Sequence, residues 1–106
     1  MEGMAWIQLA NRSDLPPGAL IEAEHQGRYI ALCNLEGDVR AVDGTCPHQG
    51  GPLGEGALNG EFITCPWHMW DFHSATGACA FNPTVTVSVY PVRTEGDLIL
   101  VDLPHA

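Results

Sequence analysis

The sequence predicts an all-β domain in which an antiparallel β-sandwich scaffold carries an inserted subdomain. Twelve glycines and eight prolines in 106 residues mark many turns, which suits short strands better than long helices. Apolar and polar residues alternate near both ends of the chain, as they do in half-buried strands. Residues 43–83 lose this alternation and are rich in Gly, Pro, Cys, His and Trp. We therefore expect one domain over residues 1–106, with the inserted subdomain at about 43–83.

Four short strands are expected before the insertion, at residues 6–10, 19–25, 29–35 and 39–42. The first is separated from the second by the break at 13–18, which contains two prolines and a glycine. Tight turns at 26–28 and 36–38, each with a central glycine, join the other three. The second, third and fourth strands should therefore form an antiparallel meander.

Three further strands are expected in the second half of the chain. One short strand at 61–64 lies inside the insertion and leads directly to Cys65. A strongly alternating segment at 85–92 predicts one continuous strand, and a turn at 94–97 returns the chain into a strand at 98–101. These last strands complete the scaffold.

Two short motifs in the insertion carry the chemistry. Cys46-Pro47-His48 is followed, after sixteen residues, by Cys65-Pro66-Trp67-His68. Each motif offers one thiolate and one imidazole, both of which bind transition metals. Four cysteines in a reducing compartment favour metal binding over disulfides. Cys46, His48, Cys65 and His68 are therefore candidate ligands, either of a zinc ion or of an iron–sulfur cluster.

The pattern C-x-H…C-x-x-H, embedded in Gly and Pro, resembles that of the Rieske-type [2Fe-2S] ferredoxins, the electron-carrier components of bacterial aromatic-ring-hydroxylating oxygenase systems. The resemblance covers most of the chain. It implies the Rieske iron–sulfur fold and one [2Fe-2S] cluster per chain. Cys46 and Cys65 would bind one iron, and His48 and His68 the other. Zinc remains the alternative, although its common sites use C-x₂₋₄-C and H-x₃₋₅-H pairs.

The chain departs from the high-potential Rieske proteins of respiratory complexes. Those proteins carry one more Cys in each ligand loop, joined as a disulfide, whereas Gly51 and Trp67 occupy the corresponding positions here. They also carry a Ser and a Tyr after the second ligand His, where this chain has Trp70 and Phe72. Because two hydroxyl donors to the cluster are missing, the resemblance implies a reduction potential near the low end of the span of about −150 to +300 mV.

The function implied by the resemblance is one-electron transfer from a flavin-containing NAD(P)H reductase to a terminal oxygenase. Binding to both partners would be transient, and the carrier would be a monomer with no catalytic activity of its own. A terminal oxygenase also needs a mononuclear iron site in a much larger domain. Two alternatives stay open: the small Rieske subunit of an assimilatory nitrite reductase-like complex, and an interaction module held together by zinc.

The net charge of −9 argues against nucleic acid and anionic membrane surfaces as partners, because both would repel the protein. It favours protein partners with basic surfaces. No apolar run approaches the length needed to span a bilayer, and the first residues lack the pattern of a secretion signal. We expect a cytoplasmic protein.

Several other residues in or near the insertion have ordinary structural interpretations. Cys33 is expected to be a small buried residue of its strand, and Cys79 could be packed or partly exposed; a disulfide between them is a minor alternative. His73 is expected to make surface or hydrogen-bonding contacts rather than bind metal. Trp70 is expected to pack in the core, while Trp67 and Met69 could either pack over the site or contact a partner.

Overall fold

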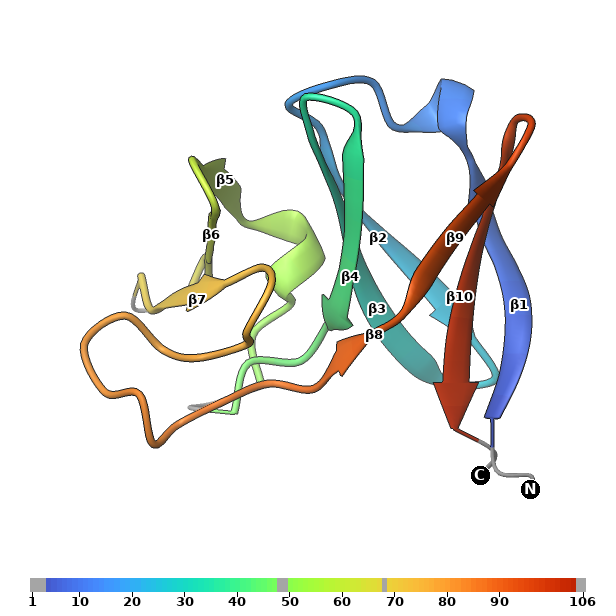
Figure 1. Ribbon diagram of the computed structural model, residues 1–106. Helices are drawn as coiled ribbons and strands as arrows, with labels where there is room; N and C mark the ends of the chain where they lie inside the picture. Colours follow the sequence, from blue (N-terminus) through green and yellow to red (C-terminus); the bar gives the residue numbers. More distant parts are fainter. Residues whose placement is uncertain (1–3, 48–49, 68, 105–106) are drawn as a thin grey trace.

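The computed structural model describes residues 4–47, 50–67 and 69–104, in which ten strands and two short 3-10 turns form three antiparallel sheets (Figure 1). The first sheet has the order β1-β10-β9, the second β2-β3-β4-β8 and the third β5-β6-β7. No helix in the described ranges is long and apolar enough to cross a membrane. The elements are β1 (Met4–Asn11), η1 (Arg12–Asp14), β2 (Leu20–His25), β3 (Arg28–Leu35), β4 (Asp38–Asp43), η2 (Leu53–Glu55), β5 (Ala57–Asn59), β6 (Phe62–Thr64), β7 (Asp71–His73), β8 (Val89–Tyr90), β9 (Val92–Glu95) and β10 (Leu98–Pro104).

The first two sheets form the scaffold, and the expected meander is confirmed. Strand β3 pairs with β2 on one side and with β4 on the other, and the turns between them lie where the sequence predicted them. Each turn has a glycine at positive φ, Gly27 at 83° and Gly37 at 102°. Figure 1 shows this sheet in the middle of the molecule, with β1, β9 and β10 on one side and the third sheet on the other.

Strand β3 is buried on both faces, which explains its nearly continuous apolar sequence. Ile30 and Leu32 face the first sheet and belong to the scaffold core with Ile99 and Val101. The alternate residues of β3 face the opposite way, into a second core that scaffold and insertion share. Its buried members are Ala31, Cys33, Val42, Cys46, Leu53, Ile63, Cys65, Phe72, Cys79 and Val87. The central strand therefore joins the scaffold to the insertion by packing rather than by a flexible linker.

The expected continuous strand at 85–92 is wrong. The chain instead forms β8, which pairs with β4 in the second sheet, and then β9, which pairs with β10 in the first. Pro91 separates the two strands, and because proline has no N–H it cannot continue a ladder. The preceding residues pair outside either scaffold sheet, with a bridge between Thr86 and Ala78 and a bond from Val87 N to Gly77 O of 2.9 Å.

The third sheet holds the expected strand near 61–64, observed as β6, and two strands that the sequence did not reveal, β5 and β7. Each of these is only three residues long, too short for a visible alternation of apolar and polar residues. Strand β6 is central, with Ile63 opposite both Leu58 and Phe72. This small sheet supports the second cysteine motif at the end of β6.

Candidate metal centre

The two cysteine motifs lie in two loops of the same length. The first loop is bounded by the bridge between Thr45 and Pro52, and the second by the pair Thr64 and Asp71. In each loop the amide of the cysteine donates to the carbonyl five residues later. Cys46 N donates to Gly51 O at 2.8 Å, and Cys65 N donates to Trp70 O at 2.7 Å.

Both loops also reverse direction at the same position, four residues after the cysteine. Gly50 has φ 79° in the first loop, where a glycine adopts this conformation without strain. Met69 has φ 60° in the second, a conformation that non-glycine residues adopt uncommonly. The side chain of Met69 is 67% exposed, so packing of that side chain does not explain the conformation. The loop itself requires it.

The folded loops bring Cys46 and Cys65 together, as the sequence predicted for two ligands of one site. Both side chains are buried, and both are free thiols in contact with each other. Burial raises the pKa of the Cys65 thiol, and contact with the Cys46 side chain raises it further, while a backbone hydrogen bond at Trp67 opposes the rise. Two adjacent buried thiolates would need a cation between them, which bound metal provides.

Gly51 makes room for this pair. A Cβ atom at residue 51 would lie 2.7 Å from the Cys65 sulfur and 3.0 Å from Cγ of Trp67. The first loop therefore passes close against the sulfur of the second, and beside Trp67 the glycine at residue 51 leaves room for this approach. A chain that places two thiols face to face, with the backbone close to a sulfur, matches the donor set of an iron–sulfur site.

The other two predicted ligands, His48 and His68, lie outside the described residues. Among the residues that the structure describes, no group of three or more His, Cys, Asp or Glu side chains is close enough to hold a metal ion. The structure thus brings together the two cysteines of the predicted set, and the assignment of all four residues as ligands stays a prediction from the sequence.

The other two cysteines are buried in the same core as this pair. Cys33 and Cys79 belong to the core between the scaffold and the insertion, and both are free, so the disulfide considered for them does not form. Burial raises the pKa of the Cys33 thiol, while the nearby Arg40 lowers it. Cys33 is therefore an inert packing residue, as its strand pattern predicted.

Aromatic residues of the second loop divide into packed and exposed members. Trp70 packs against the insertion core and meets the ring of Phe81 edge to face, with centroids 4.9 Å apart. Trp67 is 49% exposed, and Met69 is also exposed. Core packing is confirmed for Trp70, whereas Trp67 and Met69 present much of their surface to solvent.

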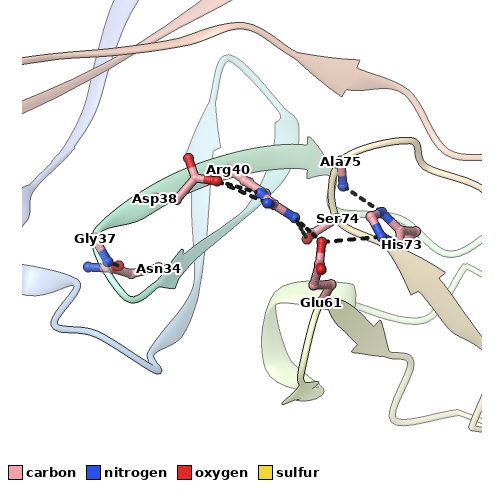
Figure 2. A network of polar contacts seen from close by, with 8 residues as sticks. All are labelled: Asn34, Gly37, Asp38, Arg40, Glu61, His73, Ser74 and Ala75. Carbon is pink, nitrogen blue, oxygen red and sulfur yellow. Dashed lines mark hydrogen bonds and ion pairs between the residues drawn. The ribbon is translucent and has the colours of Figure 1, made fainter.

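A polar network that sequence reasoning missed fixes the insertion to the scaffold (Figure 2). Arg40 on β4 is paired with Asp38 at 2.9 Å, and its other terminal nitrogen contacts Glu61 at 3.1 Å. The same nitrogen donates to Oγ of Ser74 at 2.9 Å, and Ser74 is completely buried. These contacts join residues 21 and 34 positions apart, so no local sequence signal could have found them.

His73 takes part in this network. Its Nδ1 accepts a hydrogen bond from the Ala75 amide at 3.1 Å, and its Nε2 lies 3.4 Å from Glu61. Its ring also meets Phe62 edge to face, with centroids 5.1 Å apart. The expectation of a hydrogen-bonding histidine is confirmed.

Comparison with known proteins decides the nature of the site. Residues 5–91 match the family model described as the Rieske [2Fe-2S] domain. The chain belongs to the Rieske [2Fe-2S] family. Its cofactor is therefore a [2Fe-2S] cluster, one per chain, and the zinc alternative is ruled out. The expected all-β Rieske fold is confirmed.

Three relatives illustrate the family. The Rieske chain is 32% identical over 99 residues to the ferredoxin component of a naphthalene 1,2-dioxygenase system from Pseudomonas aeruginosa, covering 92% of this chain and 95% of the relative. Among solved structures, a chain in the complex of reduced oxygenase and oxidized ferredoxin in carbazole 1,9a-dioxygenase matches with a TM-score of 0.83, 30% identity and 91% coverage of both chains. A putative NADH-dependent nitrite reductase small subunit from Mycobacterium tuberculosis matches with a TM-score of 0.84, 27% identity, and coverage of 93% and 95%.

Proposed function

We propose that this Rieske protein is a one-electron carrier that accepts electrons from a flavin-containing NAD(P)H reductase and delivers them to a terminal oxygenase acting on an aromatic compound. One observation carries the proposal: the alignment with a dioxygenase ferredoxin component includes 92% of this chain and 95% of the ferredoxin component. Because that relative is a ferredoxin component, which carries electrons and does not catalyse the oxygenation, we propose no enzymatic activity for this chain.

We propose that Cys46, Cys65, His48 and His68 hold the cluster, with both thiolates on one iron and both imidazoles on the other. The burial and mutual contact of the two cysteines support this assignment. When bound, the cluster takes up and releases a single electron. The chain excludes water from the two sulfurs by burying them under Gly51 and the second loop.

We propose that the partner proteins dock transiently on the exposed side chains of Trp67 and Met69. Both side chains are exposed, and both flank position 68 of the ligand motif. Exposed apolar residues next to a redox centre shorten the path to a docked partner and exclude water from the contact. The net charge of −9 favours basic partner surfaces. We propose a monomer that acts in the cytoplasm as a single domain, with the cluster-binding subdomain at about 43–83.

Anaerobic reconstitution tests this function. The purified protein is expected to contain two irons and two acid-labile sulfides per chain, and to show a paramagnetic resonance signal after dithionite reduction. When it is mixed with the reductase and oxygenase of a naphthalene dioxygenase system, NADH-dependent product formation should require it. Product formation that does not depend on this protein, or a protein without a reducible cluster, would contradict the carrier function.

The structural match to the nitrite reductase small subunit supports one alternative, a fixed subunit of a larger complex. The two functions differ in how long the protein stays bound to its partners, since a carrier dissociates after each transfer and a fixed subunit stays bound. A carrier should leave its partners during gel filtration of a native extract and elute near its own mass of 11.4 kDa. Co-elution with a much larger nitrite-reducing complex would favour the alternative.

A further inference from the structure

An open groove lies beside the first ligand loop, away from the two buried sulfurs. Its volume is about 380 Å³, near the lower end of the range for small-molecule pockets. Strands β2 and β3 form one wall, and the first ligand loop with its flanking residues forms the rest. The lining residues are Glu22, Tyr29, Gly44, Thr45, Gly50 and Pro52.

Glu22 is the only charged residue among them, and its carboxylate is available. It is half-buried, and within the described part of the chain it has no hydrogen bond and no ion pair. The neighbouring carboxylate of Glu24 accepts a bond from the Gly27 amide at 2.6 Å. The closest cation in sequence, Arg28, interacts with Tyr90. A partly desolvated carboxylate without a partner favours a positively charged occupant.

The position of Glu22 is fixed by the insertion itself. Residues of η2 pack directly on β2, and a Cβ atom at Gly54 would lie 2.6 Å from both Cα and Cβ of Glu22. Tyr29 is 46% exposed and lies across the ladder from Glu24, diagonal to Glu22 on the same face of the sheet. A carboxylate beside an aromatic ring is an arrangement that binds guanidinium and ammonium groups, through an ion pair and a cation–π contact.

We propose that this groove receives a lysine or arginine side chain of the redox partner, with Glu22 as its counterion and Tyr29 as its aromatic contact. This inference rests on the proposed carrier function. The floor of the groove is the loop that carries Cys46, so a partner anchored there would be held next to the proposed redox centre. A single carboxylate is too few ligands for a metal ion, and the net charge of −9 brings basic partners toward this surface.

Reduction of cytochrome c, a basic one-electron acceptor protein, provides the test. The fully loaded, reduced protein is mixed with oxidised cytochrome c in a stopped-flow instrument at about 0.15 M ionic strength, where exposed charges act over only about 8 Å. Glu22→Gln keeps the shape of the side chain and removes its charge. Glu55→Gln is the matched control, because Glu55 is exposed on η2 near the same loop but does not line the groove. Tyr29→Leu removes the ring and leaves the charge unchanged.

The second-order rate constant is expected to fall about fivefold in Glu22→Gln and about two- to fivefold in Tyr29→Leu. It should change less than about 1.5-fold in Glu55→Gln. The visible spectrum and midpoint potential of each variant should match those of the parent, which excludes damage to the cluster. Equal losses in Glu22→Gln and Glu55→Gln would overturn the groove and leave the carrier function standing. A parent protein that cannot reduce cytochrome c would overturn both.

Discussion

Replacement of Arg40 by Met is expected to loosen the contact between the scaffold and the insertion. The side chain of Arg40 is only 22% exposed and contacts Asp38, Glu61 and Ser74 at 2.9–3.1 Å (Figure 2). Met keeps most of the aliphatic volume and removes every one of these polar contacts. The change therefore isolates the polar network from the packing around it.

The expected loss is about 2–3 kcal/mol. The carboxylates of Asp38 and Glu61 are 61% and 58% exposed, so solvent screens both ion pairs and together they contribute about 1 kcal/mol. Ser74 is completely buried, and the loss of its hydrogen bond from Arg40 costs roughly another 1–2 kcal/mol. Most of the effect should therefore come from the buried hydroxyl rather than from the charges.

Unfolding of the loaded protein in urea, followed by the decay of the cluster's visible absorption, measures this loss. Cluster release makes unfolding irreversible, so the measured quantity is a rate. If the network is broken in the transition state for unfolding, 2 kcal/mol corresponds to an approximately thirtyfold faster decay. Arg12→Met is the control, since Arg12 is exposed, makes no side-chain contact among the described residues, and has the same charge. Equal decay rates in the two variants would refute the reasoning.

Three further changes have expected outcomes. Gly51→Ala places a methyl group 2.7 Å from the Cys65 sulfur and should abolish cluster loading. Gly50→Ala has open space around the new methyl group but a φ of 79°, so this variant should load fully and lose about 1 kcal/mol of stability. Iron content per chain measures the loading, and urea unfolding measures the stability. Burial raises the pKa of Tyr90, so its neutral form stabilises the fold below pH 10 and this contribution is lost as pH rises further. Tyr90→Phe should therefore lose less stability than the parent between about pH 9 and 11, and parallel unfolding-rate profiles would disprove this. The midpoint potential should be below zero, because the two aromatic residues that follow the second ligand motif carry no hydroxyl; potentiometric titration giving a value well above zero would contradict it.

The meander and the cysteine pair could be predicted from the sequence because their signals are local. Each turn contains a glycine at positive φ, Gly27 or Gly37. Apolar and polar residues alternate in a half-buried strand, whereas a strand buried on both faces is almost continuously apolar. The prediction of one strand at 85–92 was wrong because the alternation of apolar and polar residues does not indicate which sheet a residue joins. Pro91 was the local sign of a break, and its effect is to let one segment serve two sheets.

The contacts between the insertion and the scaffold could not be predicted, because they depend on tertiary distance. Arg40 is an exposed-looking residue in an alternating strand, and nothing in its neighbourhood indicates Ser74 as a partner. The groove at Glu22 likewise joins β2 and β3 to residues 44–52, which lie much further along the chain. The half-burial of the Glu22 carboxylate can be recognised in the structure but not in the amino-acid sequence.

The two ligand motifs look unequal in sequence, since the histidine follows its cysteine by two residues in one and by three in the other. The described residues of the two loops nevertheless share several backbone features. Each loop spans eight residues between paired ends, with the same cysteine amide bond and the same reversal four residues on. The conformation at that reversal suits Gly50 and costs energy at Met69, so the second loop accepts strain that a glycine would have avoided. The two cysteines therefore occupy equivalent positions in their loops although the sequence spacing of the two motifs differs.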